Sequence, residues 1–324
     1  MKIFFSSPGR RVELLKLFKK EIKDIIIIGG DYSKNSPALL FCDKIFTLPF
    51  KIDEDYINEV LKICIQEKID LVIPLIDYEL ELYSKYRKIF NDNNIEVIIS
   101  SESTIDIFSD KMKTFNFFAT YDFINNPFTC LLKDFDKNNF ENNLVILKPK
   151  NGSSGIGIHK VKRCDVEEYA RMIELNTNQY IVQEYIDFDF EVTTDVFVDK
   201  TNRLIELCQR KRLKVRGGEV ERASTIKDIN INEIIEKIIH KTSFFGVINV
   251  QIMVKGNEYF IGEINPRFGG GFPLSYYSGA NMIEHIRNHI ENKKIIQYID
   301  LRYLDNFYML RFDDAIYTQD INND

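Results

Sequence analysis

Short apolar runs alternate with amphipathic segments through the first hundred residues of the chain. Short, mostly apolar runs are typical of strands buried in a parallel sheet, whereas apolar residues three and four positions apart indicate helices. Strands are expected at residues 2–5, 25–28, 71–76 and 96–99, and helices at residues 12–18, 57–65 and 80–89. This alternation predicts a doubly wound α/β domain over residues 1–100.

The pattern changes after residue 100. Strand-like segments now follow one another with helices interspersed, which predicts an α+β fold with mostly antiparallel strands. Strands are expected at residues 144–148, 158–162, 180–183, 193–198, 204–209, 247–254, 259–264 and 307–312, and helices at residues 109–118, 166–175, 231–242 and 282–291. A segment rich in glycine and serine, residues 151–157, joins the first two of these strands.

Composition and charge narrow the class of protein. With 324 residues, 44% hydrophobic and 28% charged, the chain has material for about two folded domains. A net charge of -6 gives no general attraction to nucleic acid or anionic lipid, so any polyanion site must be local. Scattered cysteines without a CxxC pair, and the lack of a signal-peptide pattern or a long apolar run, predict a soluble cytoplasmic protein outside the membrane.

The glycine-rich segment holds the first candidate chemistry. Gly152, Gly155 and Gly157 follow the order GxxGxG and lead into a strand, whereas the dinucleotide fingerprint is GxGxxG and opens a helix. We therefore reject a Rossmann phosphate site. A glycine-rich loop between antiparallel strands can instead be a flap whose backbone N–H groups close over phosphates; an ordinary turn is the alternative. Lys148, at the end of an apolar strand, favours the flap because a phosphate would explain a lysine there.

A second set of polar residues lies near the C-terminus, on a predicted hairpin. Glu263 and Asn265 are two residues apart and so face the same side of a strand, and Gln251 lies on the neighbouring strand. Carboxylate and amide oxygens suit hard cations such as Mg²⁺, and Arg267 on the same face would meet a transferred phosphoryl group. A polar, solvated strand face is the alternative, but three glycines at residues 269–271 favour close approach of the backbone to a ligand.

Taken in order, these motifs resemble the ATP-grasp superfamily, and the resemblance covers nearly the whole chain. The run E-x-N-P-R at residues 263–267 is the most specific motif. The superfamily's ATP-binding pattern also matches in register at Lys111, Lys148, the flap, Gln183-Glu184-Tyr185-Ile186 and Glu191. The chain looks most similar to stand-alone proteins related to the synthetase half of the carbamoyl-phosphate synthase large subunit, and to the amino-acid ligase of pyrrolysine synthesis.

The resemblance implies a domain plan. A doubly wound α/β pre-ATP-grasp domain at residues 1–100 would precede an α+β ATP-grasp fold. That fold would comprise a first part with the flap at residues 101–182, a second part with the metal site at residues 183–299, and a tail at residues 300–324 that packs on the core.

The resemblance also implies roles for the matching residues. The phosphates of ATP would be bound by Lys111, Lys148 and the flap residues Gly152, Ser153, Ser154, Gly155 and Gly157. The adenine edge would be held by Glu184 and the backbone of Tyr185 and Ile186, and the ribose hydroxyls by Glu191. Gln251, Glu263 and Asn265 would face Mg²⁺, as two ions with Mn²⁺ as a substitute, and Arg267 would steady the γ-phosphoryl group or an acyl phosphate.

The second substrate is expected on two other segments. A basic run at residues 211–219 holds Arg212 and Arg216 where ATP-grasp relatives present a basic residue to the substrate carboxylate; a solvated strand and turn is the alternative. In the N-terminal domain, the turn at residues 6–11 and the acids Asp77 and Glu79 follow predicted strands. Ligands of such sheets bind beyond these strand ends, so these residues are candidates for contacts to an amine.

Together these expectations define a function. The chain is predicted to be an ATP-dependent carboxylate–amine ligase that forms an acyl phosphate and releases ADP and phosphate, with small-molecule, amino-acid-like substrates. One alternative is carbamoyl-phosphate-synthase-like phosphorylation of a small acid. Another is a non-catalytic ATP-binding protein, against which the intact Gln251, Glu263, Asn265 and Arg267 argue. By analogy with its relatives the protein would be a homodimer, and no nucleic-acid partner is expected.

Overall fold

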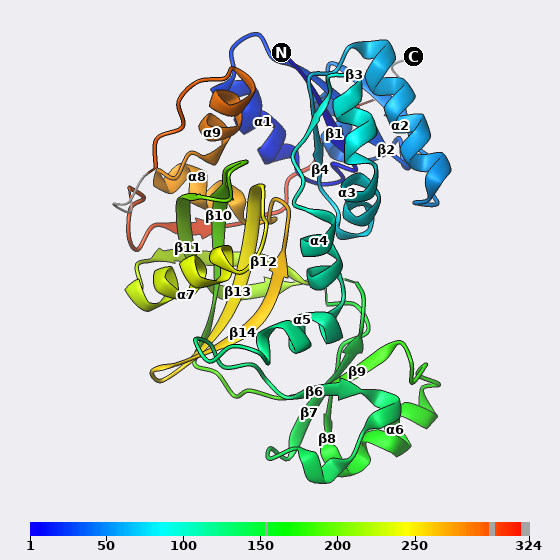
Figure 1. The fold of residues 1–324 in the computed structure, drawn as a ribbon, viewed down its shortest axis with the longest axis vertical. Coiled ribbons are helices and arrows are strands. Elements are labelled where there is room, and N and C mark those ends of the chain that lie inside the picture. Colours follow the sequence, from blue (N-terminus) through cyan, green and yellow to red (C-terminus); the bar gives the residue numbers. More distant parts are fainter. Residues whose placement is uncertain (153–154, 298–301, 319–324) are drawn as a thin grey trace.

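The computed structural model describes residues 1–152, 155–297 and 302–318. Ser153 and Ser154, predicted as part of the flap, lie outside the described residues. The described residues form a five-stranded, a four-stranded and a six-stranded β-sheet (Figure 1). No helix within them is long and apolar enough to cross a membrane.

The N-terminal sheet is parallel throughout, with strand order β3-β2-β1-β4-β5. It comprises β1 (Lys2–Ser6), β2 (Ile26–Asp31), β3 (Lys44–Thr47), β4 (Leu71–Pro74) and β5 (Glu96–Val97), with helices α1 (Val12–Glu21), α2 (Glu54–Glu67) and α3 (Asp77–Asp92). Successive residues of β1 point to opposite faces. Phe5 accordingly packs in one core with Leu14 of α1, and Phe4 in another with Tyr56 of α2 and Leu80 of α3. Helices on both faces confirm the predicted doubly wound α/β fold.

The strand order of this sheet reverses at its centre. β1 pairs with β2 on one side and with β4 on the other. The β1–α1 and β4–α3 connections therefore leave the sheet at the same edge, at the crevice where open α/β sheets bind their ligands.

The four-stranded sheet lies at the far end of the molecule from the N-terminal sheet (Figure 1). The short helices α4 (Glu102–Ser109) and α5 (Lys111–Phe118) lead to it. Its antiparallel strands, in the order β6-β9-β7-β8, are β6 (Thr129–Leu131), β7 (Leu144–Pro149), β8 (His159–Lys162) and β9 (Tyr180–Glu184), and α6 (Val166–Met172) packs beside them. Val145, Leu147 and Val182 form a core of its own with Val166.

The six-stranded sheet occupies the middle of the molecule and is antiparallel throughout, with strand order β14-β13-β10-β11-β12-β15. Its strands are β10 (Phe190–Val198), β11 (Leu204–Arg216), β12 (Glu219–Ile226), β13 (Gly246–Lys255), β14 (Glu258–Asn265) and β15 (Tyr308–Leu310), and its helices are α7 (Ile229–His240), α8 (Phe272–Ser278) and α9 (Met282–Ile290). β15 is the strand predicted near residues 307–312, and it pairs with β12 at the edge of the sheet.

One hydrophobic core joins the six-stranded sheet to the N-terminal sheet. It runs from Phe5 and Phe18 in the N-terminal part to Val196 and Ile248 in the middle of the larger sheet. The ring of Phe18 on α1 lies 5.9 Å from the ring of Phe268, just after β14. The end of β14, where the predicted metal ligands lie, is thereby packed against the N-terminal part.

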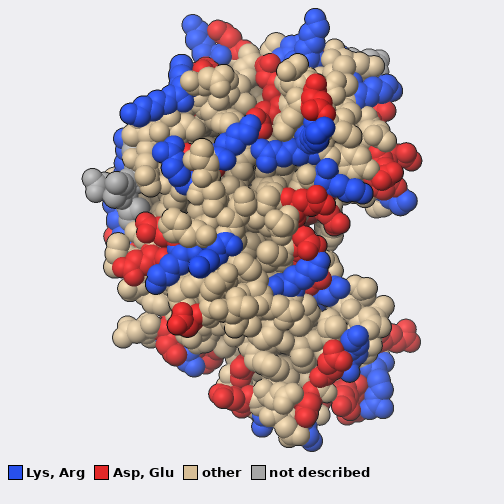
Figure 2. Space-filling model, viewed as in Figure 1, with Lys and Arg blue, Asp and Glu red and all other residues tan. Residues whose placement is uncertain are grey.

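Charged side chains are mixed on the surface. Figure 2 shows basic and acidic residues interspersed over the visible face, without a broad region of one sign. This agrees with the expectation from the net charge that a polyanion would be bound locally.

Candidate active site

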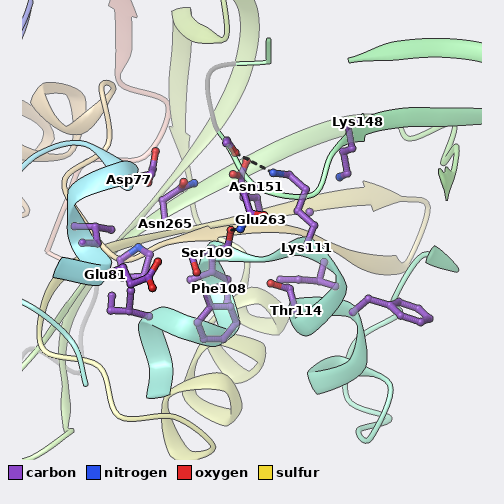
Figure 3. Close-up of a pocket in the computed structure, with 18 of the residues that line it drawn as sticks. Asp77, Glu81, Phe108, Ser109, Lys111, Thr114, Lys148, Asn151, Glu263 and Asn265 are labelled. Carbon is purple, nitrogen blue, oxygen red and sulfur yellow. Dashed lines mark hydrogen bonds between the residues drawn. The ribbon is translucent and has the colours of Figure 1, made fainter. Parts of the chain in front are cut away.

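A cavity of about 260 Å³ lies where the sheets meet (Figure 3). The N-terminus of α3, the helices α4 and α5, the strands β7 and β9, and the edge strand β14 all contribute to its wall. Its lining residues include Lys111, Lys148, Gly152, Gln183, Glu263 and Asn265. Segments far apart in the sequence thus bring five of the predicted site residues together here, with Gln183 beside them.

Lys148 sits at the end of β7 and points into this cavity (Figure 3). Its ammonium donates to Oε1 of Gln183 at 2.8 Å, and Gln183 in turn donates to Oγ1 of Thr129 at 2.9 Å. Burial, assisted by the nearby charge of Lys111, lowers the pKa of Lys148 to about 8. No carboxylate in the described part of the chain forms an ion pair with it, so an anionic ligand would supply the missing charge.

Lys111 is the first residue of α5 and contacts the start of the glycine-rich segment. Asp110 caps the helix by accepting from the backbone N–H groups of Met112 and Lys113, which fixes the helix start. The Lys111 ammonium donates to the carbonyl oxygen of Gly152 at 2.9 Å. It therefore lies beside Lys148, and both ammonium groups have neutral oxygen acceptors only, among the residues that can be described.

Three described glycines of the glycine-rich segment adopt a backbone conformation that other residues rarely take. Gly152, Gly155 and Gly157 have φ angles of 116°, 70° and 72°, in the region that favours glycine. A Cβ at Gly157 would lie 2.7 Å from Oη of Tyr180, whereas one at Gly155 would approach only the Cα of Gly218, at 3.8 Å. A smaller cavity of about 40 Å³ beneath this segment is lined by Gly155 together with Lys111, Lys148 and Glu263. The described part of the segment therefore lies over the two lysines.

Glu263 and Asn265 face the cavity from β14 (Figure 3). Within the described chain, no hydrogen bond or ion pair engages the Glu263 carboxylate. Asn265 donates to Oδ1 of Asn249 at 3.3 Å, which orients its amide. Gln251 lies opposite Glu263 in the pairing of β13 with β14, but its Oε1 accepts from Arg212 at 3.0 Å and it does not line the cavity.

These oxygens fit a magnesium ion that is shared with phosphate. The described residues contain no cluster of three or more acidic, histidine or cysteine side chains able to hold a metal alone. Mg²⁺ is commonly bound by one or two carboxylates and keeps water and phosphate as its other ligands. The free carboxylate of Glu263 and the amide oxygen of Asn265, facing two lysines, match that chemistry.

The residues predicted to bind adenine and ribose lie outside this cavity. Glu184, at the end of β9, accepts from the backbone N–H of Asn142 at 3.0 Å, and the carbonyl oxygen of Tyr185 accepts from the Asn142 side chain at 3.2 Å. Ile186 follows in the connection to β10. Glu191 forms an ion pair of 2.9 Å with Arg212, and burial raises the pKa of its carboxyl.

The structure separates the two arginines predicted to bind substrate. Arg212 is largely buried between Glu191 and Gln251 on the face of the six-stranded sheet. Arg216 is 61% exposed and pairs with Asp313 in the tail and with Glu221. Only Arg212 therefore belongs to the same polar network as the predicted metal-facing residues.

Arg267 connects the end of β14 to the N-terminal part. Its guanidinium donates to Oδ2 of Asp77 at 2.6 Å, and also to the carbonyl oxygen of Phe268 at 3.0 Å. Asp77 opens α3 and lines the cavity (Figure 3). Glu79, the other acid proposed for an amine, is instead fully buried and accepts from Ser6, Tyr56 and the backbone N–H of Leu75. Its carboxylate joins the β1–α1 connection to the β4–α3 connection and is not open to substrate.

The sequence placed Arg11 in the turn at residues 6–11 proposed for an amine, without distinguishing it from the other residues of that turn. Its Nε is buried without a hydrogen-bond partner, and its charge lies within reach of Arg267, Glu219 and Asp77. The signal in the sequence was an arginine pair directly after the first strand. Two arginines in a turn are commonly solvated, so only the structure distinguishes Arg11 from the exposed Arg10.

Two family models match the chain. One describes a PylC-like N-terminal domain and matches residues 3–98. The other describes an ATP-grasp in the biosynthetic pathway with Ter operon and matches residues 176–304. The two matches contain, respectively, the N-terminal sheet and most of the six-stranded sheet.

Curated relatives share a low sequence identity with the chain. The chain is 28% identical over 128 residues, 40% of its length, to an N5-carboxyaminoimidazole ribonucleotide synthase from Saccharolobus solfataricus. It is 23% identical over 261 residues, 74% of its length, to a formate-dependent phosphoribosylglycinamide formyltransferase from Prochlorococcus marinus. The aligned regions span 34% and 63% of these two relatives, respectively.

Solved structures extend the likeness to nearly the whole chain. The N5-carboxyaminoimidazole synthetase of Staphylococcus aureus, complexed with ADP, matches 93% of this chain and 80% of its own, with a TM-score of 0.71 at 15% identity. The biotin carboxylase domain of the Hydrogenobacter thermophilus 2-oxoglutarate carboxylase, in complex with MgADP and bicarbonate, matches 95% and 73%, with a TM-score of 0.74 at 14% identity. At these identities the likeness shows a shared fold.

Proposed function

The chain belongs to the ATP-grasp superfamily, and we propose that it is an ATP-dependent carboxylate–amine ligase that acts through an acyl phosphate. One observation carries the proposal. The ammonium groups of Lys111 and Lys148, which no carboxylate neutralises among the described residues, face the free carboxylate of Glu263 across one cavity. Phosphate groups with a bound Mg²⁺ would complete the charge of such a site.

The reaction balances as two substitutions. A carboxylate oxygen of the first substrate attacks the γ-phosphorus of ATP, and ADP leaves. The amine then attacks the carbonyl carbon of the acyl phosphate, the C–N bond forms, phosphate leaves and the nitrogen loses a proton. The first step activates a poor electrophile, so the site has to stabilise dense negative charge and keep water away.

The residues of the site divide this work. Lys111 and Lys148 would bind phosphate oxygens, and the flap from Gly152 to Gly157 would cover them and exclude water. Glu263 and Asn265, with Gln251 behind them, would hold Mg²⁺, as two ions for which Mn²⁺ can substitute. When bound, the metal neutralises charge on the phosphoryl oxygens.

The remaining predicted residues take roles at the two ends of ATP. Glu184 and the backbone of Tyr185 and Ile186 would hold the adenine, and Glu191 the ribose. Arg267, anchored by Asp77, would steady the transferred phosphoryl group. The protein would act as a homodimer on small-molecule substrates.

The test traps the intermediate. Purified protein with MgATP and a panel of carboxylates, amino acids included, is assayed for ADP release and for acyl hydroxamate in the presence of hydroxylamine. A ligase yields hydroxamate with its own carboxylate and not without ATP. Tight ATP binding in calorimetry, with neither ADP nor hydroxamate from any carboxylate, would instead establish a non-catalytic ATP-binding protein.

A further inference from the structure

The β1–α1 connection, residues 7–11, is held rigidly at the edge of the N-terminal sheet. The backbone N–H of Ser7 donates to the carbonyl oxygen of Gly30 at 2.8 Å, and the N–H of Gly9 donates to Oδ2 of Asp31 at 3.1 Å. Glu79 accepts from the hydroxyl of Ser7 at 3.2 Å. The connection is thus fixed from β2 on one side and from the first turn of α3 on the other.

Among the described residues, none forms a hydrogen bond or an ion pair with the guanidinium of Arg11, at the end of this connection. Its Nε is buried and makes no hydrogen bond, and none of the described residues forms an ion pair with its side chain. Burial, and then repulsion from Arg267, lower the pKa of Arg11 to about 10. Arg11 is half-buried, so its guanidinium can still be reached by a ligand. Holding a cation beside a second arginine, with no carboxylate of its own, costs folding free energy, and such a residue is better explained by a ligand than by stability.

The acids around Arg11 are already engaged by other groups. Asp77 accepts from Arg267 at 2.6 Å. Glu219 accepts from Arg311 at 3.0 Å and lies 3.9 Å from Arg10. The oxygens of Glu79 accept from hydroxyl and backbone groups at the other end of the connection. The neighbourhood therefore keeps an excess of positive charge, although the protein as a whole is negative.

Arg11 also lies beside the proposed reaction centre without belonging to the phosphate cavity. Neither Arg11 nor Arg267 lines that cavity, but Asp77 and Asn265, which both accept from Arg267, do. The β1–α1 and β4–α3 connections meet here at the switch point of the parallel sheet. A second substrate could reach the acyl phosphate from this side while ATP occupies the other.

We propose that Arg11, with Arg267 beside it, binds an anionic group, a carboxylate or a phosphate, on the amine substrate. The proposal deepens the ligase function and rests on it. A guanidinium presents a fork of donors that matches either anion. Substrate recognition would then lie at the N-terminal sheet and not on the basic run at residues 211–219. In that run, Arg216 pairs with the tail and Arg212 with Glu191.

Kinetics of matched variants test the proposal. The wild type, Arg11→Gln, Arg11→Lys and Arg10→Gln are compared on α-amino acids, on phosphorylated amines such as O-phosphoethanolamine, and on neutral amines such as amino-acid amides. We expect Arg11→Gln to raise the KM for the anionic amine by about tenfold or more, the loss of one charge-assisted contact. Arg11→Lys should recover part of the lost affinity for the anionic amine. The class of amine that the wild type prefers identifies the anion as a carboxylate or a phosphate.

Arg10→Gln is the matched control, since Arg10 is its neighbour in the same turn and is 78% exposed. It should behave as the wild type. Hydroxamate formation, which needs no amine substrate, should be unchanged in Arg11→Gln, and the Tm should be equal or higher because an unpaired cation is removed. Equal KM values for Arg11→Gln and Arg10→Gln, a wild-type preference for neutral amines, or a Tm loss without a change in KM would each overturn the proposal.

Failure of the ligase function would show separately. In that case the wild type forms no hydroxamate with any carboxylate, and the anion site is decided by thermal shift. Stabilisation by α-amino acids or O-phosphoethanolamine that is lost in Arg11→Gln and kept in Arg10→Gln supports the site. Identical shifts in the two variants refute it.

Discussion

The two sheets that enclose the cavity are anchored very differently. The six-stranded sheet shares its hydrophobic core with the N-terminal sheet, and Arg267 bonds to Asp77 across their boundary. The four-stranded sheet has a core of its own. Near the cavity, the residues after β7 reach the rest of the protein through polar contacts, among them Lys111 to Gly152 and Asn151 to the carbonyl oxygen of Ser109. The apolar contact there is small, with the ring of Phe115 on α5 packing 5.9 Å from that of Phe128.

This difference in anchoring predicts which sheets stay fixed and which one moves. Packed apolar cores resist relative motion, whereas a few exposed hydrogen bonds open at low cost. The six-stranded and N-terminal sheets should therefore form a fixed platform that holds Glu263, Asn265, Arg267 and Arg11. The four-stranded sheet, with Lys148 and the flap, should move as a lid over ATP.

The largest expected effect is on the platform side, at Glu263. Glu263→Gln keeps the shape of the side chain and removes its charge. We expect hydroxamate formation to fall about 10³-fold, because a charge that stabilises the transferring phosphoryl group is lost. The Tm should hold, since no described residue pairs with this carboxylate. The control is Glu258→Gln, at the exposed first residue of the same strand. A loss of less than tenfold in Glu263→Gln would show that Glu263 is not a metal ligand.

Arg212 and Arg216 give the next largest difference, in stability. Arg212→Leu leaves the largely buried Glu191 without its 2.9 Å partner, and breaking such a pair costs up to about 3 kcal/mol. Arg216→Leu removes an exposed pair and should change the free energy of unfolding by less than about 0.5 kcal/mol. Urea unfolding of both variants measures the contrast, and equal losses would show that Arg212 is not part of the platform.

The same pair shows how far the sequence could be interpreted. Arg212 and Arg216 are four apart, so a regular strand would place both on one face. The pairing of β11 with β12 is irregular between Arg212 and Val215, and Arg216, at the exposed end of the strand, pairs with Asp313 and Glu221 instead of with the residues around Arg212. Bulges depend on cross-strand pairing, and no pattern along one strand reveals them.

Elements with buried apolar runs were predictable, and those formed by pairing alone were not. β13 and α9 lie within a residue of their predicted ends. β3 was missed because it is a partly exposed edge strand. The end of β11 was foreseen only by the alternative interpretation of the basic run as a solvated strand and turn, because such a run gives no apolar alternation. The motifs located Lys111, Lys148 and Glu263, but the unpaired state of Arg11 arises from tertiary burial, which a sequence does not display.

The lid side is tested through Lys148, with a smaller expected effect. Lys148→Met removes one of two phosphate-facing ammonium groups, and we expect ATP affinity in calorimetry to fall about 10²-fold, as for a lost charge-assisted contact. Lys162→Met, on the exposed face of β8, should bind ATP as the wild type does. Equal affinities for the two variants would mean that the lid does not contribute to phosphate binding.

The pH dependence of stability is a second readout of Lys148. Its pKa is lowered from 10.5 to about 8 by burial and Lys111, against the opposing influence of Glu263. Between these pH values the unfolded chain binds more protons than the folded one, so this group makes stability rise as pH increases from 8 to 10.5. Without ATP, the wild type should show this rise relative to Lys148→Met. A constant difference between the two would contradict the burial of the charge.

The smallest expected effect comes from a glycine in the flap, compared with a glycine in a turn of the six-stranded sheet. Gly157→Ala would place a Cβ 2.7 Å from Oη of Tyr180 at a φ of 72°, a strain of about 1–3 kcal/mol. In a closing flap that strain weakens ATP binding, so the KM for ATP should rise about tenfold. Gly256→Ala, in the β13–β14 turn, shares a positive φ of 56° but has open space, so it should lower the Tm slightly and leave the KM unchanged. Because both alanines adopt left-handed backbone, a KM increase confined to Gly157→Ala isolates the closing motion from backbone strain as such.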